Sequence, residues 1–352
     1  MGTSRQRSIV FALACTTLVV CGWAGTPAGA WDRGNVETFA LLPAGTPTVE
    51  GLTVGPDGNV YVSTFNPLGS GSAQLFVFNE QGKQLRQVTI QGSSPATLGL
   101  GFNPATGRLL VIDFGASKVL DVDKDTGASS VFMTVPPAPP PPAPGHGLNA
   151  LTFDDTGNVY VSDSFQGVIW TTGPGGGAGT PWKQDALLMT TGFPPFGANG
   201  IAFNKNRSKM IVANTGNDTL VEIAVTNVGG VLTAGAATVL TNSINGADGI
   251  VLDQNDNIWV AANQADEIVV VDPTGKAIAK LGDFDGVKNG VTRGLLFPAS
   301  PAFSKDGKWL LVTNLELDLR PITGQQSVDS QWTAQVQRHS VAKLRAKIPP
   351  NP

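Results

Sequence analysis

Four residues with side-chain oxygen stand at regular positions along the chain. Glu50, Asn149, Asn199 and Asp248 each lie at the head of a short apolar run, and each is followed directly by Gly or Ala. A carboxylate or amide at the head of a buried strand needs a partner, because burying it unpaired costs free energy. Two carboxylates and two amides, with no Cys or His, form an all-oxygen donor set suited to a hard divalent cation.

Calcium fits this donor set best. Four widely spaced protein ligands match its flexible coordination better than the strict octahedron of magnesium, which with other divalent cations is the alternative. A second interpretation needs no metal, because Asn and Asp often precede strands and bond the local backbone. It explains Asn149, Asn199 and Asp248 one at a time, but not their shared position or the presence of Glu50.

The four residues belong to a repeat of about fifty residues. Its copies read VEGLTVGPDGNVYVSTF, TLGLGFNPATGRLLVIDF, LNALTFDDTGNVYVSDS, ANGIAFNKNRSKMIVANT, ADGIVLDQNDNIWVAAN and PASPAFSKDGKWLLVTN. The equivalent positions, called anchors below, are Glu50, Leu98, Asn149, Asn199, Asp248 and Ala299, at steps of 48, 51, 50, 49 and 51 residues.

Each copy predicts a strand, a tight turn and a second strand, and most continue into a third and a weaker fourth strand. Four antiparallel strands per unit, repeated six times, predict an all-β fold, a six-bladed β-propeller. The segment 34–42 precedes the first copy and is expected to supply the missing outer strand of the last blade. The first strand of each blade lines the central channel, so the anchors are expected to converge there.

The N-terminus predicts export. Arg5 and Arg7 precede an apolar stretch over 9–20 and small residues up to Ala30, the pattern of a secretory signal peptide. We expect a signal peptide over 1–30, one propeller domain over 31–346 and a disordered tail over 347–352. The protein is therefore expected to be secreted or held in a periplasm or cell envelope.

Both cysteines, Cys15 and Cys21, lie in the predicted signal peptide, so the exported chain would carry no disulfide. Without the signal, 21 basic residues face 27 acidic ones, with no basic cluster for nucleic acid. No segment has the roughly 20 apolar residues of a transmembrane helix. The expected partner is a small-molecule substrate.

Two connections are unusual in composition. The proline-rich segment 135–147 and the glycine-rich segment 173–181 are typical of a stiff spacer and a flexible hairpin. The proline run ends just before Asn149, so a place beside the binding site is the alternative for that segment.

The sequence resembles the SMP-30/gluconolactonase/luciferin-regenerating-enzyme (LRE) family of six-bladed propellers. The resemblance covers all six copies and rests on Glu50-Gly51, Asn149-Ala150, Asn199-Gly200 and Asp248-Gly249, which match the family's metal-binding motifs in order and spacing. It implies a calcium-dependent hydrolase of lactones or related esters. Asp248 is expected to be the catalytic base or nucleophile, while Glu50, Asn149 and Asn199 hold the ion.

The chain also departs from the family pattern. Gluconolactonase-like members carry an arginine two residues before the third-blade Asn to contact sugar hydroxyls, but Gly147 stands there. The sequence therefore argues against a sugar lactone. We expect the substrate pocket to include His146, Phe193, Phe196, Leu98 and Ser300, with exposure to water for His146 and core packing for the two phenylalanines as the alternatives.

Two other functions stay open at this stage. A non-catalytic propeller resembling NHL-repeat modules would present its face to a protein or glycan and keep calcium as a structural ion. A lyase or synthase on the same scaffold is a third candidate, because propellers host unrelated chemistries.

Overall fold

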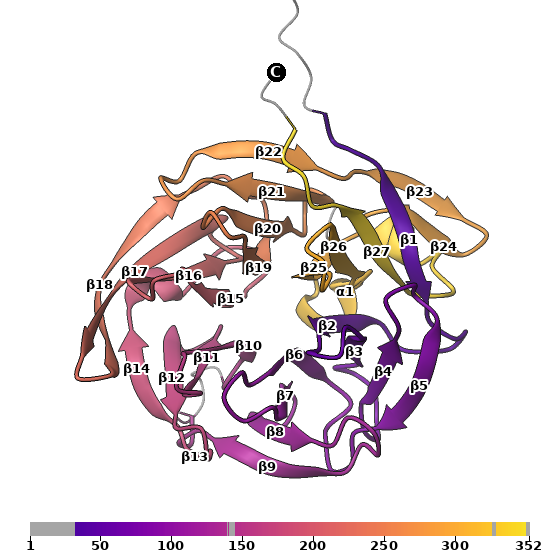
Figure 1. Cartoon of the computed structure of the whole chain (residues 1–352). Helices are drawn as coiled ribbons and strands as arrows, with labels where there is room; N and C mark the ends of the chain where they lie inside the picture. The colour runs from indigo at the N-terminus through magenta and orange to yellow at the C-terminus, as the bar shows by residue number, and fades with distance from the viewer. Residues whose placement is uncertain (1–31, 139, 141–144, 326–328, 350–352) are drawn as a thin grey trace, which may run out of the picture. The chain divides into compact units, whose positions relative to one another are not determined.

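Six small β-sheets form a ring around a central channel (Figure 1). The computed structural model describes residues 32–138, 140, 145–325 and 329–349. The predicted signal peptide and the end of the predicted tail lie outside this range. Among the described residues, no helix is long and apolar enough to cross a membrane.

The first three blades follow one another along the chain, and their innermost strand comes first. Their strands, from the channel outward, are β2 (Val49–Val54), β3 (Val60–Thr64), β4 (Gln74–Phe78) and β5 (Gln84–Thr89) in blade 1; β6 (Thr97–Phe102), β7 (Leu109–Asp113), β8 (Lys118–Val122) and β9 (Ser129–Thr134) in blade 2; and β10 (Leu148–Phe153), β11 (Val159–Asp163), β12 (Val168–Thr172) and β14 (Thr180–Gln184) in blade 3.

The other three blades keep this order. Their strands are β15 (Ala198–Phe203), β16 (Lys209–Asn214), β17 (Thr219–Val228) and β18 (Val231–Thr241) in blade 4; β19 (Ala247–Leu252), β20 (Ile258–Ala262), β21 (Glu267–Val271) and β22 (Ala277–Leu281) in blade 5; and β25 (Pro298–Phe303), β26 (Trp309–Asn314), β27 (Ser340–Arg345) and β1 (Val36–Leu41) in blade 6.

The N-terminal strand closes the ring, as the sequence predicts. β1 pairs antiparallel with β27 and completes the last blade from the opposite end of the chain. Each innermost strand also contacts the innermost strands of both neighbouring blades, including β25 with β2. The predicted six-bladed propeller with four strands per blade is therefore confirmed.

Burial explains the distribution of apolar and polar residues along the repeat. Every residue of the second strands β3, β7, β11 and β20 is buried, because neighbouring blades cover both of their faces. The outermost β5 alternates between exposed and half-buried residues. Apolar runs therefore mark the second strands of these blades, and polar residues mark the outer strand of blade 1.

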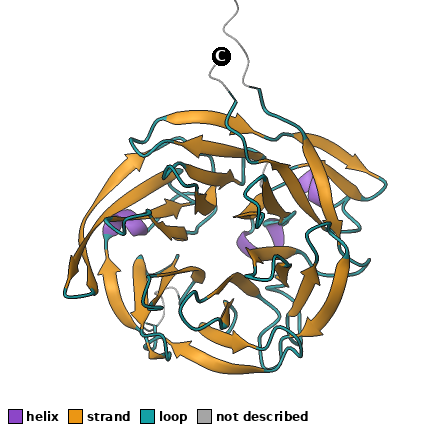
Figure 2. Ribbon diagram, in the orientation of Figure 1, coloured by secondary structure: helices purple, strands orange, loops and turns teal. Residues whose placement is uncertain are grey.

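Three features depart from plain four-stranded blades. In the glycine-rich segment expected to form a flexible hairpin, β13 (Gly177–Ala178) pairs in parallel with β9 and adds a fifth strand to blade 2. The connection between blades 5 and 6 forms a hairpin of β23 (Phe284–Lys288) and β24 (Val291–Gly294). Short helices, η1 (Ala186–Leu188), α1 (Arg320–Thr323) and α2 (Ser330–Thr333), occur only in connections (Figure 2).

Candidate functional site

The six anchors occupy one position of the fold. Each is the second residue of a six-residue innermost strand. In all six blades the pairing register of this strand shifts between its first and fourth residues. Such a bulge leaves the residues within it unpaired and redirects their side chains. The bulge thus frees the anchor side chain to face the channel.

After four of the six anchors the next residue is glycine, and the next blade lies against it. A Cβ atom at Gly51 would lie 2.1 Å from the carbonyl oxygen of Leu98, and one at Gly200 would lie 2.5 Å from that of Asp248. The anchors of neighbouring blades are therefore packed backbone to backbone. The small residue in each motif reflects this close approach.

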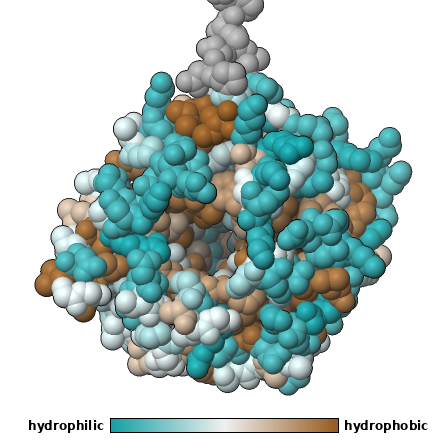
Figure 3. Space-filling view, viewed as in Figure 1, coloured by the Kyte–Doolittle hydropathy of each residue, from teal (hydrophilic) through white to brown (hydrophobic). Residues whose placement is uncertain are grey.

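The four oxygen-bearing anchors line one pocket in the channel. Glu50, Asn149, Asn199 and Asp248 are all buried, with exposures of 4–5%. The cavity volume is about 40 Å³. This is room for a cation and a few waters, because one water needs roughly 10–15 Å³. Figure 3 shows the disc hollowed at its centre.

The two carboxylates are poorly satisfied by the protein. Among the described residues, Glu50 Oε2 and Asp248 Oδ1 are buried side-chain oxygens without a hydrogen-bond partner. Burial, and then the charge of Asp248, raises the pKa of Glu50 well above its usual value. Burial raises the pKa of Asp248 to about 6, although a hydrogen bond from Asn263 opposes the shift. The pocket thus lacks positive charge.

The two asparagines are oriented by hydroxyl groups. Asn149 Nδ2 donates to Ser164 Oγ at 3.3 Å, and Asn199 Nδ2 donates to Thr215 Oγ1 at 2.9 Å. Each hydroxyl in turn donates to a backbone carbonyl of the next blade, Ala198 O and Ala247 O. Because the NH₂ groups are used in this way, the amide oxygens are left as acceptors for the pocket.

These residues fit a hard divalent cation. Two orphaned carboxylate oxygens and two amide oxygens are the ligand types that calcium prefers. Within the described ranges, no group of three or more His, Cys, Asp or Glu forms another candidate metal site. The donor set here contains only two such residues and depends on the amides for the rest.

Sequence reasoning missed Asn263. It directly follows β20, lines the pocket and is 2% exposed. Its Nδ2 donates to Asp248 Oδ2 at 2.8 Å, and its Oδ1 is another buried atom without a partner among the described residues. Ser164 and Thr215 follow the second strands of their blades in the same way. In the other three blades this position holds Phe65, Phe114 and Leu315, so the shared position is a signal that could have revealed polar partners in blades 3, 4 and 5 only.

The predicted substrate-pocket residues divide into two groups. Leu98 and Phe196 line the pocket, and Ser300 Oγ lies 3.5 Å from Glu50 Oε1. His146, Phe193 and Ser300 are not among the lining residues, although Ser300 contacts the lining residue Glu50. The ring of His146 is held between Asp163 Oδ2, at 2.6 Å from Nδ1, and Pro136 O, at 2.7 Å from Nε2.

Both His146 and Phe193 have contacts outside the pocket lining. His146 is bound on both ring nitrogens and joins the proline-rich segment to blade 3. Phe193 packs against the hydrophobic core that surrounds Leu98 and Phe65, which is the alternative that the sequence left open. Gly147 has no room for a side chain, because a Cβ atom there would lie 2.8 Å from the ring of Phe165.

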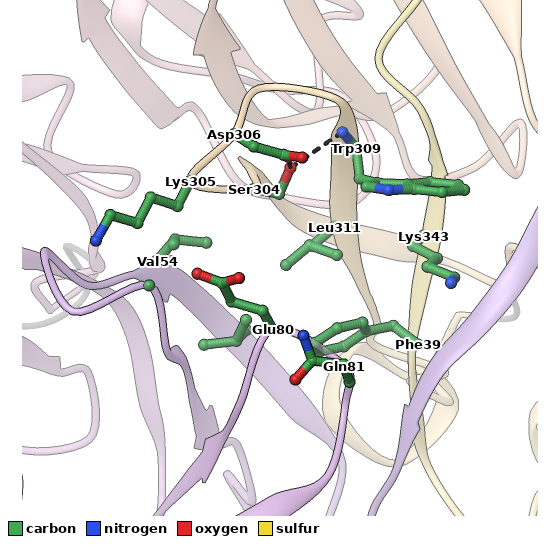
Figure 4. A pocket seen from close by; sticks show the side chains of 12 residues that line it. Phe39, Val54, Glu80, Gln81, Ser304, Lys305, Asp306, Trp309, Leu311 and Lys343 are labelled. Atoms are coloured by element: carbon green, nitrogen blue, oxygen red, sulfur yellow. Dashed lines mark hydrogen bonds between the residues drawn. The ribbon is translucent and has the colours of Figure 1, made fainter.

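A second, larger pocket lies between blades 1 and 6, beside the turns that end their innermost strands (Figure 4). Its cavity volume is about 210 Å³. Its charged groups are exposed and several are paired with neighbours: Asp306 accepts from Ser304, and Lys305 donates to Pro56 O. It lacks the orphaned buried carboxylates of the channel, so we place the candidate site in the channel.

Solved structures share this fold at low sequence identity. A luciferin-regenerating enzyme aligns with a TM-score of 0.62 and 16% identity, covering 90% of this chain and 97% of that one. A gluconolactonase from Xanthomonas campestris aligns at 0.60 and 13%, covering 90% of each chain. A calcium-binding regucalcin from Agrobacterium tumefaciens aligns at 0.58 and 19%, covering 89% and 97%.

A comparison with curated proteins gave no match. At the level of family, the description SMP-30/Gluconolactonase/LRE-like region matches residues 92–282, more than half of the chain. That span contains three of the four oxygen-bearing anchors, and Glu50 stands at the equivalent position of blade 1. The chain belongs to the SMP-30/gluconolactonase/LRE-like family.

Proposed function

We propose that the protein is a divalent-cation-dependent hydrolase of lactones or related esters. One observation carries the proposal: two buried carboxylates line one pocket together with two asparagines, and each carboxylate has an oxygen without a hydrogen-bond partner among the described residues. Glu50, Asn149, Asn199 and Asp248 would hold the cation, with calcium the best match and magnesium or another divalent cation the alternative. A bound cation of this kind polarises a carbonyl oxygen and stabilises the negative charge that develops on it.

The protein groups supply the proton transfer. Asp248 Oδ1, which has no hydrogen-bond partner among the described residues, would bind the cation, whereas Oδ2 accepts one hydrogen bond from Asn263 and keeps a lone pair for a proton. In the proposed reaction, water adds to the carbonyl carbon and Asp248 takes a proton from it. The carbon–oxygen single bond of the ester then breaks, and the departing alkoxide takes up the proton. A lactone is converted in this way to a hydroxy acid.

Cation binding and turnover test the proposal separately. Calorimetry with calcium should detect one binding site, and calcium should raise the melting temperature. Turnover of a lactone and aryl-ester panel should be lost with EDTA and restored by calcium. Asp248→Asn should lower kcat by at least about a hundredfold, the scale of a general base.

Glu80→Gln is the matched control. It removes an exposed carboxylate from the second pocket and should change neither binding nor turnover. Absence of cation binding, or activity that survives EDTA and Asp248→Asn, would overturn the proposal. A cation that stabilises the protein without any turnover would instead favour the non-catalytic propeller.

A further inference from the structure

The channel pocket has two unlike sides. Its polar side is formed by the oxygen-bearing anchors with Thr215 and Asn263. The rest of the wall is apolar and comes from blades 1, 2 and 6 and the connection before blade 4. The apolar lining residues are Phe65, Leu98, Pro194, Phe196, Phe297, Leu315, Leu317 and Leu319.

Three leucines of this wall come from one short segment after β26. Leu315, Leu317 and Leu319 alternate with Glu316 and Asp318. Glu316 accepts hydrogen bonds from Thr292 and His339, and Asp318 forms an ion pair with Arg320. These partners hold the carboxylates outside the pocket, while all three leucines line it. The alternation therefore builds an apolar wall from a segment that carries charge.

Four phenylalanines continue the wall, and we call them the phenylalanine cluster. Phe114 contacts Phe65 and Phe165, with ring centroids 5.9 and 6.0 Å apart, and Phe165 contacts Phe196 at 5.3 Å. Phe65 and Phe196 line the pocket. Phe114, Phe165 and Phe196 are only partly buried, so the cluster presents aromatic surface to a ligand larger than the cavity.

We infer that the substrate is a lactone or ester whose non-reacting part is hydrocarbon, either an alkyl chain or an aromatic ring. This inference rests on the proposed function, which places the reacting carbonyl at the polar side. Hydrocarbon on the leucines and the phenylalanine cluster leaves water favourably. Sugar hydroxyls there would lose hydrogen bonds to water, because no side chain of the apolar wall carries a donor or acceptor.

Binding can be tested without hydrolysis. Cyclopentanones with 2-alkyl groups of increasing length carry the carbonyl but no scissile bond. Calorimetry with the full chain should show affinity rising roughly threefold per methylene over the first few carbons, with or without calcium. The same order should appear in kcat/KM for alkyl-substituted γ-lactones with calcium, and a polyhydroxylated lactone should be a poor substrate.

Leu317→Ser tests the wall itself. Leu317 is only half-buried, so its replacement is compatible with folding. It should lower ketone affinity and kcat/KM for the long-chain lactone about tenfold, and the loss of kcat/KM for unsubstituted γ-butyrolactone should be clearly smaller. Leu85→Ser is the control, because Leu85 is 49% exposed on the outermost strand of blade 1; it should have no effect.

The outcomes separate the two proposals. If γ-butyrolactone is hydrolysed but chain length and Leu317→Ser change nothing, or the polyhydroxylated lactone is preferred, the inference is wrong and the proposed function stands. If ketones bind in the expected order but no lactone or ester is turned over, the apolar site is real and the proposed hydrolysis is wrong.

Discussion

Asn263 and Ser300 show how single residues prepare the channel pocket. Asn263 donates to one oxygen of Asp248, and Ser300 donates weakly to one oxygen of Glu50, so each carboxylate keeps its other oxygen facing the pocket without a partner. A buried carboxylate without a compensating positive charge destabilises the folded protein. Without a metal, the two buried carboxylates therefore lower the free energy of unfolding, and a bound divalent cation would compensate their charge.

Glu50→Gln should affect stability and cation binding in opposite directions. At pH 8 without metal, it removes a buried charge and its repulsion with Asp248, so the free energy of unfolding should rise by about 1 kcal/mol or more. Calcium affinity should fall by at least about tenfold, because one carboxylate ligand is lost. Chemical denaturation and calorimetry measure the two effects. A variant that is less stable without metal and still binds calcium normally would contradict this account.

At the scale of elements, the bulge in each innermost strand and the small residue within it act together to position the anchors. The bulge turns the anchor toward the channel, and the small residue lets the neighbouring anchor approach. The sequence predicts the pairs Glu50-Gly51, Asn199-Gly200 and Asp248-Gly249 as a motif. It does not show that the glycine contacts the next blade, because that contact joins residues about fifty positions apart.

Gly200→Ala should disturb the candidate cation site, although Gly200 is not one of its candidate ligands. The added Cβ atom would lie 2.5 Å from Asp248 O and 2.7 Å from Ile250 N. Both are backbone atoms, so β19 must shift to make room. We expect a loss of about 1–3 kcal/mol in the free energy of unfolding and weaker calcium binding. Gly175→Ala is the control, because nothing lies within 4 Å of its Cβ position; equal effects of the two changes would refute the argument.

Two buried carboxyl groups, one on blade 5 and one on the connection that carries the leucine wall, influence each other's pKa. Asp266 lies in the turn between β20 and β21, and Asp329 directly precedes α2. Burial, and then the charge of Asp329, raises the pKa of Asp266 to about 8; burial raises the pKa of Asp329 to about 6. Asp266 Oδ1 also accepts from the backbone N–H of Phe297, a residue of the pocket wall.

Stability should therefore fall as the pH rises from about 6 to 8. In the folded protein Asp329 keeps its proton up to about pH 6 and Asp266 up to about pH 8, whereas the unfolded chain loses both near pH 4, so unfolding releases protons up to about pH 8. The melting temperature should drop by a few degrees. Asp266→Asn keeps the acceptor for Phe297 and should reduce the drop. Without metal, Glu50 and Asp248 also make the melting temperature fall as the pH rises. The test is therefore the difference in this pH dependence between Asp266→Asn and the wild type. Glu80→Gln is the control.

For the whole molecule, the sequence predicts the structural features that recur with the fifty-residue repeat, but not the features that occur in a single connection. Six copies of a fifty-residue pattern predicted the ring, the closing strand and the anchors' shared position. Phe65, Phe114 and Leu315 directly follow the second strands of their blades and so share the period, whereas Phe196, Leu317 and Leu319 lie in connections that differ in length and composition and follow no period. The apolar half of the pocket comes largely from these segments. The contact between His146 and Pro136 could likewise not be predicted, because Pro136 lies in an irregular segment.

Closure by β1 should decide whether the ring unfolds as one unit. A chain that begins at Pro43 lacks β1 and the buried side chains of Ala40 and Leu42. It leaves the edge of β27 unpaired, and exposed strand edges promote aggregation. We expect a broad thermal transition at lower temperature and self-association in light scattering. A chain that begins at Asp32 keeps every strand and is the control. If the shorter chain melts as sharply and at the same temperature as the control, β1 does not hold the ring together.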